Sequence, residues 1–186
     1  LKSLGAELTS IKDASGTEYL WQGNPEFWSG QAPVLFPIVG CLRNGTATIG
    51  DNKTCSFGRH GLARRLEFDL VSSSDTSITY SLKANDKTKE QYPYDFELQM
   101  TYELTEHGVK VSHTVINHDS VVMPYCVGGH PAFNCPVFEN ESFEDYIVEF
   151  EQPENAACAQ LTEDGLINNA DRVSVLENEA VIPVRH

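Results

Sequence analysis

The sequence predicts an all-β protein, an antiparallel β-sandwich. Short runs of alternating polar and apolar residues recur along the 186 residues, and Gly, Asn, Asp and Ser separate them. No segment keeps the 3.6-residue apolar repeat of an amphipathic helix, and the chain has no internal repeat. Many short strands at regular spacing are typical of a sandwich, so we expect one domain over residues 1–186.

The first half of the chain is expected to consist of short strands joined by tight turns. The segment at residues 33–40 is apolar but interrupted by prolines, so we expect it to pack beneath a site rather than to form a central strand. Residues 50–53 read as a hairpin turn, and the polar residues 85–91 read as a loop. The other expected strands cover residues 4–11, 18–21, 47–49, 54–57, 66–72 and 77–83.

The second half contains the cleanest strand pattern. Apolar and polar residues alternate over residues 94–104, which predicts a half-buried strand. The strand expected next places His113 among apolar residues, so we interpret this histidine as packed rather than ligating. Further strands are expected at residues 109–117, 121–127, 146–150 and 180–184, with a turn at residues 162–165.

The charge balance restricts the partners of the protein. Lys and Arg number 13 against 27 Asp and Glu, which gives a net charge of −14. Nucleic acids and anionic membrane surfaces attract basic proteins, so both are excluded as expected partners. No apolar run is long enough to span a bilayer. The acidity fits an uncharged small molecule such as a sugar.

The cysteine pattern indicates free thiols. The number of cysteines is odd and no pair has C-x-x-C spacing, which argues against a zinc site. A chain of this length does not need disulfides, so we expect thiols in a reducing cytoplasm and no metal ligands. The five positions are Cys41, Cys55, Cys126, Cys135 and Cys158.

Two histidines lie in glycine-containing segments. His130 is in the GGHPAFN segment at residues 128–134, and His60 is in the GRHGLAR segment at residues 58–64. Imidazole titrates near neutral pH and therefore suits proton transfer. The alternative for each histidine is a satisfied turn or core residue. Because both follow expected strands, where a sandwich places its binding loops, we predict that they converge on one concave face.

An aromatic pair, Phe27 and Trp28, follows a predicted break at residues 23–25. A tryptophan in a loop can stack on a sugar ring. It can equally close the end of the sandwich, because aromatic side chains contribute a large buried area. Both interpretations remain open at this point.

Five segments resemble one family in order and spacing. The two histidine segments, APVLFPIVG at residues 32–40, LGAEL at 4–8 and YPYDF at 92–96 are similar to the aldose 1-epimerase (galactose mutarotase) family, specifically its LacX-like branch. The resemblance implies a galactose-mutarotase-like sandwich (a supersandwich). Members of that family extend further at the C-terminus, so residues 1–186 are expected to be part of a larger sandwich, incomplete at its C-terminal end.

The resemblance also implies a reaction and roles for the two histidines. The family interconverts the anomers of aldoses by acid–base ring opening, without a cofactor. His130 corresponds to the general acid that protonates the ring oxygen, and His60 to the histidine that binds the substrate near that oxygen. The glutamate base and an aspartate that holds sugar hydroxyls are expected beyond residue 186, and neither is assigned to a residue here.

Two arginines are candidates for substrate binding. Cys41 occupies the position where the LacX-like pattern has an arginine, and Arg43 would point to the same side of an extended strand. A cysteine cannot donate the forked hydrogen bonds of a guanidinium. Arg64 matches the arginine of the family's HGFAR pattern and faces either the substrate or an acidic surface neighbour.

Other functions compete with the mutarotase interpretation. A non-catalytic carbohydrate-binding domain on the same scaffold would explain Cys41 and the missing glutamate. A hexose-phosphate epimerase would use Arg64 and Arg43 on the phosphate. A module that serves only assembly leaves the paired histidine segments unexplained. The sequence does not identify the sugar or the oligomeric state.

Overall fold

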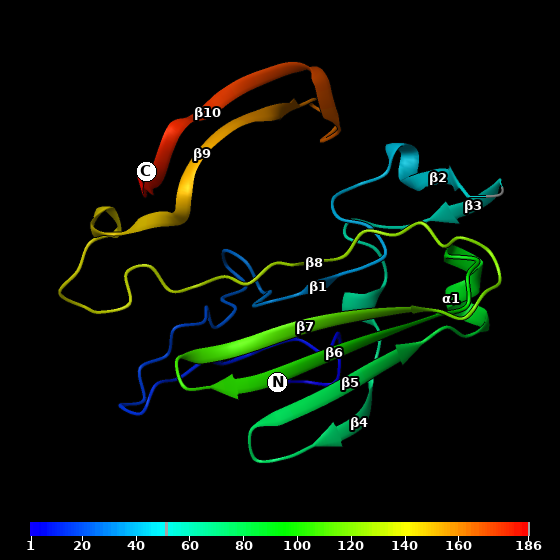
Figure 1. Ribbon diagram of the computed structural model, residues 1–186, viewed down its shortest axis with the longest axis horizontal. Coiled ribbons are helices and arrows are strands. Elements are labelled where there is room, and N and C mark those ends of the chain that lie inside the picture. The colour runs from blue at the N-terminus through cyan, green and yellow to red at the C-terminus, as the bar shows by residue number, and fades with distance from the viewer. Residues whose placement is uncertain (51, 186) are drawn as a thin grey trace.

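A computed structural model describes residues 1–50 and 52–185, and the predicted all-β antiparallel architecture is confirmed. Its main element is a sheet with the strand order β4-β5-β6-β7, all antiparallel (Figure 1). The predicted turn at residues 50–53 includes Asp51, which lies outside the described residues. The bounds of the four strands are β4 Asp69–Ser73, β5 Ser77–Lys83, β6 Phe96–Thr105 and β7 Gly108–Asn117.

Strand β6 supplies much of the core. Its alternating residues Phe96, Leu98, Met100 and Tyr102 are buried, as the period-two pattern predicted. The hydroxyl of Tyr102 donates a hydrogen bond to the carbonyl oxygen of Ala6 at 2.7 Å. The N-terminal segment is thereby attached to the sheet.

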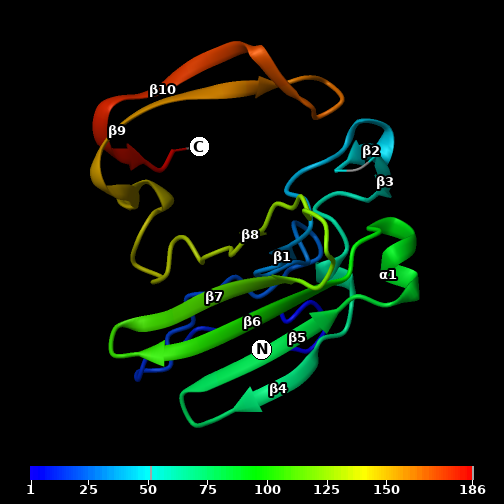
Figure 2. The same ribbon diagram turned by 45° about the vertical axis from the view of Figure 1, so that its right-hand side comes forward.

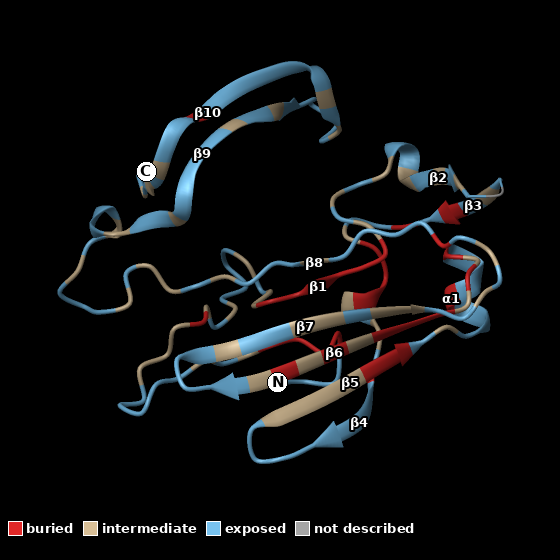
Figure 3. Ribbon diagram, viewed as in Figure 1, coloured by how far each residue is buried: buried red, intermediate tan, exposed pale blue. Residues whose placement is uncertain are grey.

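A second layer, made of β1 (Val34–Leu35) and β8 (Gly128–Gly129), packs on this sheet. Next to β1, Phe36 is 0% exposed, and its ring packs against the rings of Tyr92 and Phe96. Figure 3 shows the buried residues gathered in β1 and the central strands. The prediction that residues 33–40 form a packed, interrupted segment is confirmed.

Two hairpins lie outside these layers. The small hairpin pairs β2 (Thr46–Ile49) with β3 (Lys53–Ser56), and the long one pairs β9 (Ile147–Leu161) with β10 (Ile167–Pro183). In both views the long hairpin is a curved ribbon set apart from the four-stranded sheet, with β8 between them (Figures 1 and 2). Most of its residues are exposed.

Four expected segments differ from the structure, and one of them, the strand expected at residues 18–21, is reduced to isolated bridges at Glu18 and Leu20. Residues 86–91 form helix α1 (Asp86–Gln91) instead of a loop, because Asn85 and Thr88 form a reciprocal capping box at its start. The strand expected at residues 4–11 is replaced by a turn in which Ala6 has φ 46°, and isolated bridges remain on either side. Residues 121–127 are not a strand, since Pro124 has no N–H to donate.

The strands expected at residues 146–150 and 180–184 are the paired ends of the long hairpin. Val181 lies opposite Glu149, and Ile182 opposite Val148. Both strands extend much further than predicted, to the confirmed turn at residues 162–165, where the N–H of Gly165 donates to the oxygen of Thr162. Several register shifts interrupt the pairing, which explains why no clean alternation marked these strands in the sequence.

Two expectations drawn from the composition concern membrane-spanning segments and disulfides. Within residues 1–50 and 52–185, no helix is long and apolar enough to cross a membrane. The thiols of all five cysteines are unpaired, as predicted.

His113 is packed, as predicted, and its burial has a consequence for stability. His113 is on β7, opposite Met100 of β6. Its Nε2 atom is buried and has no hydrogen-bond partner in the described part of the chain. Burial lowers the pKa of His113 below its ordinary value of 6.5. The unfolded chain therefore takes up the proton at higher pH than the folded chain does.

We expect the free energy of unfolding to fall as the pH is lowered below 6.5 towards the depressed pKa of folded His113. His113→Leu should make this loss smaller. The pKa of His60 is also lowered, so part of the loss should remain. Urea unfolding of both proteins at about pH 8 and about pH 5 measures the effect. An unchanged difference between the two pH values would show that His113 is as solvated in the folded state as in the unfolded one.

Candidate functional site

Strand β1 fixes the position of His130. In the antiparallel pair of β1 and β8, Gly129 lies opposite Val34, and the N–H of His130 donates to the oxygen of Pro33 at 3.2 Å. His130 is therefore the first residue after β8, and its side chain is exposed. Pro131 follows and restricts His130 towards an extended backbone.

The continuation of β1 fixes the position of His60. Phe36 forms a parallel bridge with Gly61, and its carbonyl oxygen accepts hydrogen bonds from the N–H groups of Leu62 and Ala63, at 2.9 and 3.2 Å. Gly61 has φ +74°, and a Cβ added there would lie 2.2 Å from the oxygen of Phe36. The approach of the two backbones therefore requires glycine at position 61.

The predicted convergence of the two histidines is confirmed, and the concave shape of the face that they share stays a prediction. The ring centroids of His60 and His130 are 6.0 Å apart, with an angle of 61° between the ring planes. His60 has φ 67°, a conformation that is uncommon for a residue with a Cβ and is often found at functional sites. The segment between β1 and residue 40 thus carries both imidazoles into one site.

Backbone hydrogen bonds set the protonation of His60. The N–H of Gly40 donates to Nδ1 of His60 at 3.0 Å, and the N–H of His60 donates to the oxygen of Gly40 at 2.7 Å. Burial lowers the pKa of His60, and the positive charges of Arg64 and His130 act in the same direction. His60 is therefore neutral at neutral pH and carries its proton on Nε2, where it can be donated to a ligand.

Trp28 lies beside His130, although the sequence analysis did not place it among the catalytic or substrate-binding candidates. Its indole lies against the imidazole of His130, with ring centroids 5.2 Å apart. The side chain is partly buried, and its role as a sugar-stacking residue or as an aromatic plug stays a prediction. The one local sign of a close approach in the sequence is Gly30, because a Cβ there would lie 2.5 Å from the indole.

Arg64 lies near His60 in the 3₁₀ turn Ala63–Arg65. Its Nε atom is buried and has no hydrogen-bond partner among residues 1–50 and 52–185. No ion pair within 4.0 Å involves Arg64 in that part of the chain, so the alternative of an acidic surface neighbour is not supported. Substrate binding by Arg64 stays a prediction.

Arg43 is the first residue of the 3₁₀ turn Arg43–Gly45. The preceding residue, Leu42, has an extended backbone with φ −93° and ψ 146°. Arg43 lines a cavity of about 420 Å³ together with Asp164 and Leu166 of the long hairpin. The histidines are not among the lining residues, and substrate binding by Arg43 stays a prediction without structural support.

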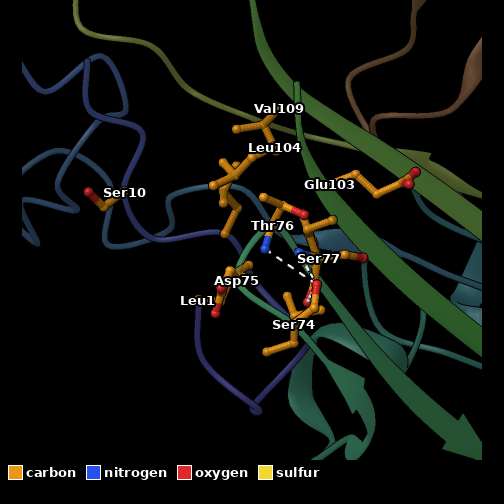
Figure 4. Close-up of a pocket in the computed structure, with 12 residues that line it drawn as sticks. Leu1, Ser10, Ser74, Asp75, Thr76, Ser77, Glu103, Leu104 and Val109 are labelled. Atoms are coloured by element: carbon orange, nitrogen blue, oxygen red, sulfur yellow. Dashed lines mark hydrogen bonds between the residues drawn. The ribbon is translucent and has the colours of Figure 1, made fainter. Parts of the chain in front are cut away.

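Two further cavities lie on the four-stranded sheet. One, of about 280 Å³, is lined by Ser74 and Thr76 of the β4–β5 turn and by Leu104 (Figure 4). It contains neither histidine. A smaller apolar cavity of about 120 Å³ lies between β7 and His130. In the described residues, no three His, Cys, Asp or Glu side chains are grouped so that they could hold a metal ion.

Sequence comparison matches the chain to one protein family and to two curated relatives. The profile of the family described as Aldose 1-epimerase matches residues 1–176. The plasmid and chromosomal forms of "Protein LacX" from Lactococcus lactis subsp. lactis are each 44% identical over 184 residues. These matches cover 96% of this chain and 62% of each relative. The chain therefore spans less than two thirds of the length of the curated relatives it matches.

Structural comparison gives the same result. A galactose mutarotase related enzyme from Lactobacillus acidophilus superimposes with a TM-score of 0.91 at 33% identity, over 100% of this chain and 61% of that protein. A galactose mutarotase-like protein from Lactobacillus casei superimposes with a TM-score of 0.86 at 33% identity, over 99% and 63%. The galactose-mutarotase-like fold predicted from the sequence is confirmed by these likenesses.

Proposed function

Because the chain belongs to the aldose 1-epimerase family, we propose that the protein interconverts the α and β anomers of an aldohexose. The observation that supports this proposal is the pairing of two imidazoles from distant segments, with ring centroids 6.0 Å apart. In the reaction, the C1 hydroxyl loses a proton while the ring oxygen gains one, and the C1–O5 bond breaks. Rotation about C1–C2 and reclosure invert the anomer and return both protons.

His130 is the proposed general acid. Its imidazole is exposed at the end of β8, so a sugar can approach it directly. A protonated imidazole donates its proton to the ring oxygen as the C1–O5 bond breaks, and recovers it when the ring closes. No covalent intermediate, metal or nucleotide enters this reaction.

His60 is the proposed partner that orients the ring oxygen. The hydrogen bond from Gly40 to Nδ1 leaves the Nε2 proton of His60 for a sugar oxygen. The lowered pKa keeps His60 neutral, so it acts as a fixed hydrogen-bond donor beside the acid. A protonated His60 would instead repel the imidazolium form of His130.

Arg64 is the proposed contact for sugar hydroxyls. Its buried Nε has no hydrogen-bond partner in the described residues, and burial of an unpaired donor is unfavourable unless a ligand satisfies it. The general base is not assigned to a residue of this chain. Residence in a reducing cytoplasm, suggested by the cysteine pattern, belongs to the same proposal.

Polarimetry of freshly dissolved glucose and galactose tests the function in the intact natural protein. We expect the approach to anomeric equilibrium to exceed the spontaneous rate measured without protein. Glucose 6-phosphate, assayed in parallel, tests the hexose-phosphate alternative, which requires a much higher kcat/KM for the phosphorylated sugar. Saturable sugar binding without acceleration would instead identify a carbohydrate-binding domain.

His60→Gln should weaken sugar binding and lower the mutarotation rate together. Glutamine can still form hydrogen bonds, but it cannot reproduce the geometry that Gly40 imposes on the imidazole. Loss of one oriented hydrogen bond predicts an increase in KM of about tenfold. Polarimetric kcat and KM measure the effect. A variant with unchanged KM would place His60 outside the substrate contacts.

A further inference from the structure

We infer that Trp28 is a positioning residue for His130, and that its indole holds the imidazole in the orientation from which the proton is delivered. The inference rests on the proposed function, because the orientation of His130 matters only if His130 is the general acid. It adds a residue that the resemblance to the family did not supply. The tilted contact between the two rings, with centroids 5.2 Å apart, is its starting point.

His130 needs such support because its own segment restrains little of the side chain. The N–H of His130 is bonded to Pro33, but that bond fixes the backbone and leaves both side-chain torsions free. The side chain is exposed, and no hydrogen bond to its ring nitrogens is found in the described part of the chain. The neighbouring rings, Trp28 and His60, therefore limit its rotation.

The loop that carries Trp28 is itself fixed. The N–H groups of Trp28 and Phe27 donate to the oxygen of Asn24, at 2.8 and 3.1 Å. The indole N–H of Trp21 donates to the oxygen of Trp28 at 2.8 Å. The Trp28 indole folds back over Gly30, where a side chain would overlap it. These contacts hold the indole in one position, so it can restrict the rotation of the His130 imidazole.

The Trp28 loop and the His130 segment are also bonded to each other. The N–H of Trp21 donates to the oxygen of Ala132, and the N–H of Ala132 donates to the oxygen of Gln31, both at 2.9 Å. Leu20 and Phe133 form an isolated antiparallel bridge. Both rings are therefore attached to one hydrogen-bonded frame, and the distance between them is set by the backbone rather than by chance contact of mobile loops.

A fixed imidazole favours proton transfer because small errors in placement are costly. Displacement of a reacting group by about 1 Å can lower a rate by about 10²-fold. Trp28 makes its contact through the ring, so a smaller aromatic ring should retain part of the effect and a methyl group none. A positioning role therefore predicts a loss in kcat that follows the size of the ring.

The kinetic test compares three variants in the intact natural protein. Trp28→Ala should lower kcat by about 10-fold to about 10²-fold with KM little changed, and Trp28→Phe should recover most of the loss. Phe27→Leu is the matched control, because Phe27 is the adjacent aromatic residue and is 76% exposed. A raised KM with unchanged kcat, or equal losses for Phe27→Leu, would overturn the positioning role.

A spectroscopic test does not depend on activity. Protonated imidazole in contact with indole quenches its fluorescence, so the contact between Trp28 and His130 should make the Trp28 emission depend on pH. The difference between the emission of the wild type and of Trp28→Phe isolates Trp28, because the chain has 2 tryptophans. His130→Gln should abolish the pH-dependent change, and His60→Gln should retain it. A change that persists in His130→Gln would show that the rings are not in contact in solution.

The two tests separate this inference from the proposed function. If the protein does not accelerate mutarotation but the fluorescence change requires His130, the ring contact stands and the proposed function fails. If mutarotation requires His130 but Trp28→Ala keeps the wild-type kcat, the positioning role fails and the proposed function stands. The far-ultraviolet circular dichroism of Trp28→Ala distinguishes loss of kcat from loss of folding.

Discussion

His130→Gln is expected to lower the rate of anomer interconversion by about 10²–10⁴-fold, the usual contribution of a positioned proton donor. Glutamine retains a hydrogen-bond donor of similar reach but has no proton to give at neutral pH. The ring oxygen would then have to take its proton from water. Because His130 is exposed and its side chain is not part of the buried core, the folded structure should survive the change.

The sugar affinity of His130→Gln should change little, since the substitution removes proton transfer and not the site. Equilibrium binding of galactose, measured beside polarimetric mutarotation, separates the two properties. His107→Gln is the matched control, because its histidine lies in the β6–β7 turn with a side chain that is 87% exposed. Wild-type activity in His130→Gln would refute the assignment of the acid and leave the GGHPAFN segment with a structural role.

The sequence predicted the elements whose signals are local. The alternation over residues 94–104 located β6 because each side chain alternates between core and solvent in a regular strand. The two histidine segments were found because glycine and proline punctuate the chain where backbones bend or approach closely. Their convergence followed from the rule that a sandwich groups its loops at the ends of its strands.

Two segments were predicted wrongly because the local conformation overrode the hydrophobic pattern. Asn85 and Thr88 cap a short helix in a stretch too polar to show an apolar repeat. Ala6 has φ 46° in the turn that replaces the strand expected at residues 4–11. In each case a side chain or a positive φ decided the conformation, and patterns of hydrophobicity do not record either.

The role of Trp28 was left open for a different reason. Whether a loop tryptophan closes a sandwich or joins a site depends on which segment lies next to it in space. Here that segment is residues 130–134, more than a hundred positions away, and it is brought there by bonds such as that between Trp21 and Ala132. A close approach over Gly30 was the one local sign, and a single glycine does not identify what approaches it.

Gly61→Ala is expected to lower the free energy of unfolding by about 2–5 kcal/mol. The left-handed backbone at Gly61, with φ +74°, costs an alanine about 1–2 kcal/mol. The added Cβ would lie 2.2 Å from the oxygen of Phe36, and overpacking of this kind costs about 1–3 kcal/mol more. The neighbouring atom belongs to a buried backbone, so it cannot move aside as a flexible side chain would.

Gly58→Ala provides a matched control in the same loop. Gly58 has no left-handed φ, and the nearest atom to an added Cβ is a terminal guanidinium nitrogen of Arg65 at 3.9 Å. The same substitution should therefore change the free energy of unfolding by less than about 1 kcal/mol. Urea unfolding of the wild type and both variants measures the difference. Equal effects at positions 58 and 61 would contradict the close backbone approach on which the site is built.

Gly61→Ala should also impair the site more than its stability loss alone would predict. The oxygen of Phe36 accepts hydrogen bonds from Leu62 and Ala63, directly after Gly61, and His60 directly precedes it. Relief of the clash has to separate the β1 segment from the His60 segment, and β1 also carries His130 through β8. The two imidazoles would then move apart even in molecules that remain folded. Mutarotation measured well below the unfolding midpoint should therefore fall by about 10²-fold, which ties the activity to the backbone contact that brings the histidines together.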